Sequence, residues 1–326
     1  LKKPMKLQPI AWALIAANVL LMIIGVVNAY SIYRVSGDII GSFTSSAISP
    51  IHHPTYFAAF NMFTLILVWW GRSKKWHYFG TRNTLLFFFF SAMVQIVCAS
   101  LAGILFFNVM VFFVLIRWIG RRFGKKIMAG VIGLLVALQV SLVLMLPRIG
   151  NDIQYTLNVM KKFGENPYHY VQTHPDYKTG NEVRLIMWTV GISEWMQHPM
   201  GVGTGNVEEN LNYRLYRSNQ KTMVLSDYNP HNQFIQTAVE IGFIGLFFLL
   251  AIIFGGLRFA KQHRNWPLFL LLLNLAFNCM FESMFQRSSG IVFFTFLTCV
   301  LVVYSHSKAT EVTEKEEAST SDFNKR

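Results

Sequence analysis

The sequence predicts an all-α, polytopic transmembrane helical bundle of about eight spans with one long external, partly helical loop. Three observations predict it. Of the 326 residues, 53% are hydrophobic and 14% are charged, where a soluble domain carries about 25% charged residues. The apolar residues form long runs of the length that crosses ~30 Å of hydrocarbon. The basic residues concentrate in the connections between those runs. A disordered, collagenous or disulfide-scaffold protein is excluded, and an ordinary soluble enzyme is disfavoured.

Eight apolar stretches are candidates for membrane spans. They are Ile10–Tyr30, Pro54–Trp70, Thr84–Ala99, Leu101–Ile116, Ile127–Leu146, Gln233–Leu257, Trp266–Phe281 and Ser288–Tyr304. The third and fourth are predicted to form a hairpin that turns near Ser100–Gly103. The uncharged stretch between Arg82 and Arg117 would be roughly 51 Å long as one helix, which is too long for a single crossing.

The charge pattern gives the orientation of the spans. Four connections hold fifteen Lys and Arg residues and no Asp or Glu: Leu1–Pro9, Gly71–Arg82, Arg117–Lys126 and Arg258–Arg264. The positive-inside rule places all four, and both chain ends, in the cytoplasm. The segment Pro147–Asn232 is then external, with eight basic and eight acidic residues. The net charge of +13 is therefore an orientation signal facing anionic lipid, and no nucleic-acid partner is expected.

Four segments follow from this topology. Residues 1–146 carry five spans, 147–232 form the periplasmic loop with interfacial helices, 233–304 carry three spans, and 305–326 are expected to be a disordered cytoplasmic tail rich in Glu, Lys, Ser and Thr. The chain begins with Leu1 and shows no signal-peptide pattern, so we expect helices upstream of it. The three cysteines lie in apolar runs without ligand spacing.

The external loop is where function is expected, because a long loop among short connections is uncommon. Helical spacing is found over Asn151–Phe163, Glu182–Gln197 and Val207–Lys221. The run from Met200 to Asn206, which contains Gly203 and Gly205, lacks the strand and Lys of a phosphate-binding P-loop. It is either a flexible turn or a place where backbone approaches a substrate.

The loop ends at a predicted helix start. Asn229 is a suitable N-cap and Pro230 a suitable first helical residue, which puts His231 in the first turn at the external membrane surface. A helix N-terminus disfavours the imidazolium form, so a neutral His231 could accept a proton. An interfacial histidine without a chemical role is the alternative.

Glu240 follows nine residues later, roughly 13 Å deeper in a continuous helix. A carboxylate at that depth faces a cavity or a partner, so structural pairing and chemistry both remain open. Gly242 and Gly245 are expected to allow close helix contact.

Three loop arginines, Arg184, Arg214 and Arg217, are the candidates for holding a diphosphate, because a guanidinium group contacts phosphate oxygens in a bidentate way. Solvated charges on amphipathic helices are the alternative for each of them.

These motifs resemble the O-antigen ligase and O-antigen polymerase (Wzy-type) superfamily. The residues that carry the resemblance are Arg184–Trp188, Pro199–Gly205, His231–Asn232 and Glu240–Gly245, and His53–Tyr56 is similar to another recurrent element. The likeness extends over about residues 53–300 and is specific across 184–245.

The resemblance implies a polytopic inner-membrane glycosyltransferase that acts on the periplasmic side. Such an enzyme moves a glycan from undecaprenyl diphosphate to an acceptor hydroxyl, which for ligases is on lipid A-core, and requires no cofactor, nucleotide sugar or metal. By matching positions, His231 is the catalytic histidine and Arg184 the arginine that engages the diphosphate. Supporting residues would be Asn232, Glu240, Gly203 and Gly205.

One family element is missing. Family members commonly carry a Ser-Arg-Gly-like element in an earlier span, whereas the corresponding turn here, Ser100–Gly103, has no arginine. Arg148, Arg214 or Arg217 could replace it, or the donor is bound differently. A polymerase with the same donor and a growing glycan as acceptor is the closest alternative function, and a small-solute transporter is a more distant one.

Overall fold

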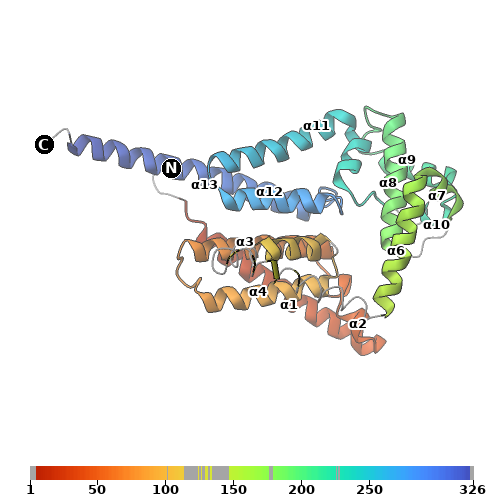
Figure 1. Ribbon diagram of the computed structural model, residues 1–326, viewed down its shortest axis with the longest axis horizontal. Helices are drawn as coiled ribbons and strands as arrows, with labels where there is room; N and C mark the ends of the chain where they lie inside the picture. Colours follow the sequence, from red (N-terminus) through yellow and green to blue (C-terminus); the bar gives the residue numbers. More distant parts are fainter. Residues whose placement is uncertain are drawn as a thin grey trace. The chain divides into compact units, whose positions relative to one another are not determined.

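A computed structural model describes residues 5–100, 102–113, 147–175, 179–224 and 228–323, together with Ser226 and isolated positions between 124 and 133. Every regular element in these ranges is a helix, which confirms the all-α prediction (Figure 1). The chain divides into two compact units. The first unit is Leu1–Phe107 with Leu250–Arg326, and the second is Asn108–Leu249.

The first unit is a bundle of long apolar helices. Its elements are α1 (Gln8–Ser36), α2 (Ile39–Ser42), a 3₁₀ turn η1 (Ser45–Ala47), α3 (Pro54–Ser73), α4 (Thr81–Cys98), α12 (Trp266–Cys279) and α13 (Ser288–Phe323). A further helix, Ala102–Phe113, follows α4. The helix α11 (Gln233–Gln262) runs from the second unit into the first.

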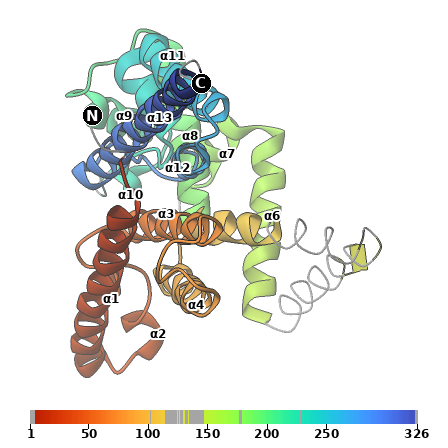
Figure 2. The same cartoon turned by 90° about the vertical axis from the view of Figure 1, so that its left-hand side faces the viewer.

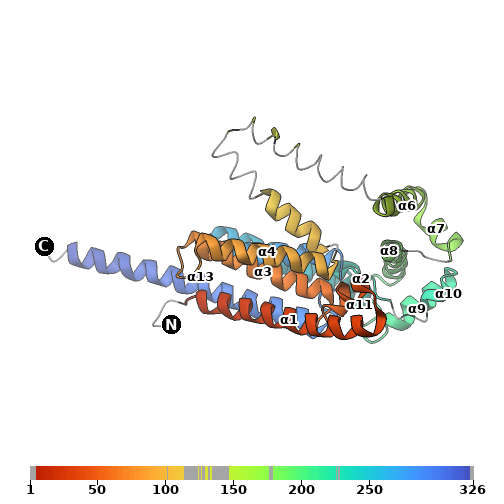
Figure 3. The ribbon, with the colours of Figure 1, turned by 90° about the horizontal axis from the view of Figure 1, so that it is seen from below.

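Helix α3 is the centre of this bundle. It contacts α1, α4, α12 and α13 (Figure 3), and every residue from Pro54 to Val68 is buried. Buried amides tie α3 to its neighbours, because a polar group in an apolar bundle needs a partner on another helix. Asn18 Nδ2 donates to Thr64 Oγ1 over 2.9 Å, Gln95 Nε2 to the carbonyl of Ala58 over 3.1 Å and Asn274 Nδ2 to that of Ala59 over 2.9 Å.

The described parts of three connections predicted to be cytoplasmic meet at one end of this bundle: residues 5–9, Gly71–Arg82 and Arg258–Arg264. The amide of Met5 donates to Ser307 Oγ over 3.0 Å, and Gln8 Nε2 donates to the carbonyl of His77 over 3.1 Å. At the other end, Tyr56 Oη donates to the carbonyl of Ser283 over 2.9 Å. The first unit therefore separates its basic connections from its predicted external turns, as the positive-inside rule requires.

Some predicted spans match helices long enough to cross a membrane, and others match shorter or buried helices. In the part of the chain that the structure describes, four helices are long and apolar enough to cross a membrane: Gln8–Ser36, Thr81–Cys98, Gln233–Gln262 and Ser288–Ser307. The prediction at Trp266–Phe281 is met by a shorter apolar helix, and that at Pro54–Trp70 by the buried α3. Of Leu101–Ile116 the structure describes Ala102–Phe113, and Ile127–Leu146 lies outside the described residues apart from isolated positions. The chain is a helical membrane protein.

The turn of the hairpin predicted between the third and fourth spans is confirmed. Helix α4 ends at Cys98, and Ala99 takes a left-handed φ of 50°. Ser100 Oγ donates to Thr55 Oγ1 over 3.3 Å, which fixes the turn to the start of α3. A Cβ at Gly103 would lie 2.8 Å from that of Ala58, so a small residue is required there.

The helix α13 extends to Phe323 and so includes most of the C-terminal segment 305–326. This segment contains Ala, Glu and Lys, which have high helix propensity.

The second unit consists of shorter helices around its own core. They are α6 (Pro147–Glu165), α7 (Pro167–Thr173), α8 (Gly180–Gln197), α9 (Val207–Arg217), α10 (Lys221–Val224) and the first part of α11. The predicted helices of the loop are thus present, the third of them interrupted after Arg217. Helix α8 is central, with α6 and α7 against it (Figure 2). Its Ile186, Met187 and Val190 are buried in one core cluster with Leu211 and Leu215 of α9.

A buried carboxylate fixes α6 and α7 to the start of α8. Glu182, which is 1% exposed, accepts hydrogen bonds from Tyr155 Oη at 2.8 Å and Tyr170 Oη at 2.5 Å. Burial and the bond to Glu182 raise the pKa of Tyr155 to about 12, so its phenol stays protonated and donating at neutral pH. Burial raises the pKa of Tyr170 in the same way.

The bundle geometry predicts the outcome of a topology experiment. A reporter fused after Lys74 should read as cytoplasmic, and one inserted at Asn219, between α9 and α10, as external, because basic connections stay inside. Alkaline phosphatase and green fluorescent protein fusions at both positions measure this. A cytoplasmic reading at Asn219 would contradict the orientation.

Candidate functional site

The membrane helix α11 is interrupted at Gly242. This residue has φ 73° and ψ −162°, values outside the helical region. About 20 residues follow it to Gln262, enough for one crossing of ~30 Å. On this segment Phe243, Phe247 and Phe248 are exposed, as expected of side chains that face lipid. The break therefore lies where the membrane span begins, and Gln233–Ile241 is a separate helical segment before it.

The glycine-rich run after α8 fills this break. The amide of Val202 donates to the carbonyl of Val239 over 2.8 Å, and that of Gly203 donates to the carbonyl of Glu240 over 2.9 Å. In return, the amide of Phe243 donates to the carbonyl of Pro199 over 2.9 Å. In an unbroken α-helix the amide of Phe243 would bond to Val239. Loop backbone thus replaces helix backbone at this point, which satisfies groups that would be costly to leave unpaired in a membrane.

Two glycines make this close approach possible. Gly201 has φ 86°, and a Cβ there would lie 2.6 Å from the carbonyl oxygen of Glu240. A Cβ on Gly242 would lie 2.4 Å from the carbonyl oxygen of Pro199 and would also overlap the backbone of Met200. At Gly201–Gly203 the glycine run is therefore held against the break in α11. Gly205 lies beyond the docked part and is exposed.

The helix start near His231 differs from the prediction. Asn229 is not the N-cap and Pro230 is not the first helical residue; α11 begins at Gln233. Asn232 Oδ1 accepts from the amides of Phe234 at 3.0 Å and Ile235 at 3.2 Å, which are the two bonds of an N-cap. Both Asn229 and Asn232 are suitable N-cap residues. The helix starts after Asn232 because its side chain accepts hydrogen bonds from two helical amides.

His231 lies one residue before this cap in a sparsely populated conformation. Its φ is 46°, and its amide donates to Asn229 Oδ1 over 2.8 Å. A non-glycine residue with positive φ is strained, and such residues cluster at functional sites. Its side chain is half-buried. His231 is thus held between two asparagines, one bonded to its own amide and one capping the following helix.

The His231 turn packs against the middle of α8. A Cβ on Gly191 would lie 2.7 Å from Ile235 Cγ2 and 3.6 Å from Pro230 Cγ. Arg184 precedes Gly191 by seven residues, which is two helical turns, so it shares that face of α8 roughly 10 Å along the axis. Arg184 is half-buried, and its Nε is buried without a hydrogen-bond partner among the described residues. The structure brings Arg184 and the His231 turn to one face of one helix.

Arg214 is placed differently. Its Nε is bound to Oε2 of Glu194, a carboxylate only 2% exposed, and its guanidinium also donates to Gln197 and Ser193. His198 Nδ1 lies 2.7 Å from the other oxygen of Glu194. Arg214 thus connects α9 to the end of α8 through a carboxylate that competes with any phosphate ligand. Arg217 is exposed in the last turn of α9.

Glu240 lies before the span rather than 13 Å within it, because α11 is broken two residues later. Its Oε1 accepts from Gln236 Nε2 over 2.8 Å, and its carbonyl accepts from Gly203. Gly245 lies within the continuous part of α11, where an added Cβ would meet side chains of its own helix, Ile241 and Thr237.

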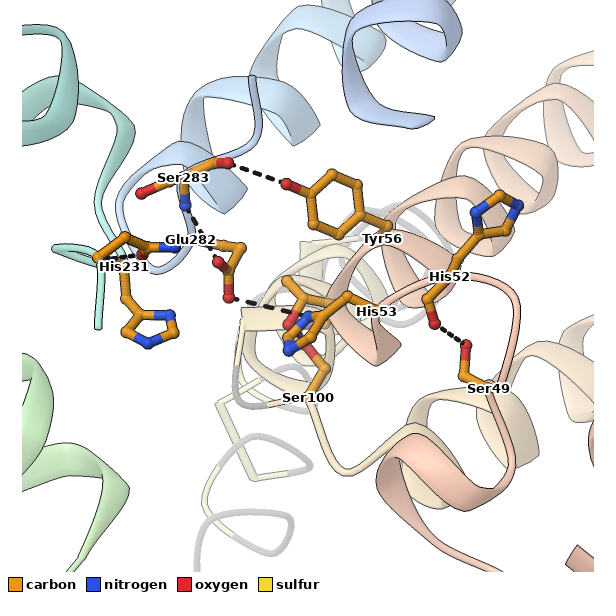
Figure 4. A network of polar contacts seen from close by, with 11 residues as sticks. Ser49, His52, His53, Tyr56, Ser100, His231, Glu282 and Ser283 are labelled. Atoms are coloured by element: carbon orange, nitrogen blue, oxygen red, sulfur yellow. Dashed lines mark hydrogen bonds and ion pairs between the residues drawn. The ribbon is translucent and has the colours of Figure 1, made fainter. Parts of the chain in front are cut away.

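The first unit carries a second cluster of chemical groups at its predicted external end (Figure 4). His53, the residue before α3, has its Nδ1 3.8 Å from Oε2 of Glu282, a carboxylate that is 5% exposed. Tyr56, one turn later, is held by Ser283 beside that carboxylate. The sequence element at His53–Tyr56 therefore meets the turn between α12 and α13.

Three buried carboxylates were missed by sequence reasoning: Glu182, Glu194 and Glu282. Glu194 and Glu282 stand in apolar stretches, which is the available signal, because an isolated acid there needs a partner. Glu182 lies beside Asn181 and two residues before Arg184 and gives no such signal. Tyr155, Tyr170, Arg214 and His53 lie 12 to 229 residues from the carboxylates that they contact, which no local pattern shows, whereas His198 lies only four residues after Glu194. In the described part of the chain, no group of three or more His, Cys, Asp or Glu residues is arranged to hold a metal ion.

Comparison with known families then gives the family. A family model described as O-antigen ligase matches residues 85–250, half of the chain, and includes α8, the glycine run and His231. The chain belongs to the O-antigen ligase family. The recognition of the O-antigen ligase and polymerase superfamily from sequence motifs is thus confirmed. Membership indicates a glycosyltransferase-like membrane enzyme. No curated protein matches the chain.

The docking of the glycine run in this O-antigen ligase family member predicts unequal effects of two glycine substitutions on α11. Gly242→Ala should lower stability by at least about 1–2 kcal/mol, because its φ is left-handed and its Cβ would overlap backbone. Gly255→Ala, on the same helix with open space around it, should leave stability unchanged or slightly higher. Thermal unfolding in detergent measures both, and equal melting temperatures would refute the close approach.

Proposed function

We propose that this chain is a lipid-linked glycan ligase that moves a glycan from undecaprenyl diphosphate to a hydroxyl group of lipid A-core. The transfer takes place on the periplasmic face of the inner membrane. The family match supports a reaction of this class. The observation that carries the proposal is the face of α8 shared by Arg184 and the His231 turn, at the membrane end of α11. A lipid-linked donor presents its diphosphate at this level, where the span begins.

In this proposal Arg184 holds the donor diphosphate. Among the described residues its hydrogen bond is long, from Nη1 to Asn181 Oδ1 at 3.4 Å, and its buried Nε has no partner there. A partly buried guanidinium with unused donors favours an anionic ligand over solvent. Arg214 is already engaged by Glu194 and has a positioning role, fixing α9 on α8. Exposed Arg217 is left as the second loop arginine that a donor could reach.

His231 is the general base. The acceptor hydroxyl attacks the anomeric carbon of the glycan, its proton passes to the imidazole, and the bond between that carbon and the diphosphate oxygen breaks. The diphosphate departs with the bonding electrons, and Arg184 stabilises its charge. The strained backbone of His231 and the cap at Asn232 preorganise the ring before substrate binds.

A polymerase of the same superfamily is the second candidate, and the family match supports it equally. The two differ only in the acceptor. Glycan profiles of a deletion strain separate them: loss of glycan from lipid A-core with chain length retained indicates the ligase, and loss of chain length indicates the polymerase.

The diphosphate role predicts that Arg184→Lys is impaired although charge is kept, because Lys cannot form the bidentate fork. Apparent donor affinity should weaken by on the order of 1–3 kcal/mol. Donor titration of transfer by purified protein measures it. Arg72→Lys, an exposed residue of α3, is the matched control and should behave as wild type. Unchanged donor affinity in Arg184→Lys would remove the assignment.

The base role predicts that His231→Ala loses roughly 10²–10⁴ in turnover while donor binding persists. His198→Ala should lose much less turnover, because His198 contacts Glu194 at the end of α8 and takes no part in the proposed proton transfer. Transfer rates at matched membrane levels test this, since a misfolded variant would imitate a catalytic defect. Near-wild-type turnover by well-expressed His231→Ala would falsify the role.

The proposal also requires no metal. Transfer by purified protein should continue in excess EDTA, because the charge of the diphosphate is held by arginine rather than by a cation. Activity that EDTA abolishes and a divalent ion restores would contradict this mechanism.

A further inference from the structure

A cavity of about 290 Å³ opens at the end of the first unit that carries the basic connections. Three segments far apart in the sequence line it: the end of α3, the connection between α11 and α12, and α13. The side chains that matter for its chemistry are Trp70, Lys74, His263, Arg264, Trp266 and Tyr304. Its volume lies at the lower bound of small-molecule sites, which is about 300 Å³, so it accommodates a headgroup rather than a whole lipid.

The cavity is cationic. Lys74 and Arg264 contribute one positive charge each, and among the described residues no Asp or Glu lines it. Neither cation forms an ion pair with a residue that the structure describes. Lys74 Nζ lies 5.7 Å from the centre of the Trp70 ring, which holds the ammonium at the cavity wall.

Arg264 occupies a position that favours glycine. The end of α11 is a Schellman motif: the amide of Asn265 donates to the carbonyl of Ala260 over 2.8 Å, and that of Arg264 to Lys261 over 3.2 Å. In this motif Arg264 takes a left-handed φ of 49°. Glycine adopts this conformation without strain, whereas a residue with a Cβ does not. The backbone conformation therefore does not favour arginine here, and the reason for it lies in its positive charge and its donors.

The base of the cavity is rigid. Asn265 is buried and donates over 2.7 Å both to Ser305 Oγ and to the carbonyl of Leu301 on α13. Its Oδ1 caps α12 by accepting from the amide of Leu268 over 3.1 Å. The two rings of Trp70 and Tyr304 meet edge to face at 5.9 Å. The cationic side chains therefore extend from a fixed frame.

We propose that this cavity binds the phosphate-bearing headgroup of an anionic phospholipid from the leaflet facing the basic connections. Arginine and lysine provide the donors that phosphate oxygens accept. Trp266, which is 55% exposed at the start of α12, is the amphipathic ring expected at headgroup level. A soluble phosphate has the same oxygens but no apolar part that would contact these aromatic rings. The site is separate from the proposed glycan-transfer site and does not depend on it.

The test uses the full chain in detergent, titrated with phosphatidylglycerol and, separately, with phosphatidylcholine, with bound lipid counted by native mass spectrometry. Wild type should retain one phosphatidylglycerol about tenfold more tightly than phosphatidylcholine. Arg264→Gly should lose that preference while its melting temperature is equal or higher, because glycine fits the left-handed position. Lys75→Gly is the matched control: Lys75, in the connection between α3 and α4, also has a left-handed φ, 54°, and one positive charge, but does not line the cavity. It should retain the preference.

Equal retention of phosphatidylglycerol by wild type and Arg264→Gly would overturn the proposal, as would an equal loss in Lys75→Gly, which would indicate unspecific charge. Binding of inorganic phosphate in a competition arm, without any preference among lipids, would overturn the lipid assignment. Lys74→Gln is the second variant if Arg264→Gly fails to fold. It should weaken phosphatidylglycerol binding about tenfold, and unchanged binding would count against the site.

Discussion

The structure of the second unit depends on the backbone exchange between the glycine run and the break in α11. Opening a helix at a membrane surface exposes polar backbone groups, and leaving each one unpaired would cost about 1–3 kcal/mol. Three hydrogen bonds remove that penalty: the amides of Val202 and Gly203 donate to α11, and the carbonyl of Pro199 accepts from the amide of Phe243. Because this run directly follows α8, the exchange fixes the end of α8 to α11. The Gly191 contact fixes its middle, so Arg184 and His231 are carried by elements joined at two points.

In the first unit, the two ends of the bundle carry different ionisable groups. Its basic connections meet at one end, and the His53–Glu282 pair lies at the other, with the buried α3 between them. Buried amides join the helices, because apolar packing alone discriminates poorly among neighbours in lipid. The same separation that orients the protein leaves Lys74 and Arg264 side by side around a cavity. Orientation and ligand binding can therefore rest on the same residues.

The fold could be predicted from the sequence because the length of the spans and the charge of their connections are local properties of the chain. The hairpin turn at Ser100 and the helices of the loop follow from the same patterns. The break at Gly242 was not visible, since Ile241, Phe243 and Ile244 continue an apolar helical pattern across it. The start of α11 was misplaced because Asn229 and Asn232 are equivalent caps until tertiary structure selects one. The partner of Arg214 was not predictable, since Glu194 lies on another helix twenty residues away.

The exchange itself is tested most directly by hydrogen exchange at single amides of the purified chain, resolved by fragmentation of overlapping peptides. The amides of Val202, Gly203 and Phe243 should exchange slowly, because each donates to a carbonyl across the break. The amide of exposed Gly205, in the same run, should exchange quickly and serves as the internal reference. Exchange of Val202 and Gly203 as fast as that of Gly205 would show that the run is not docked and would remove the basis for placing Arg184 and His231 on one rigid frame.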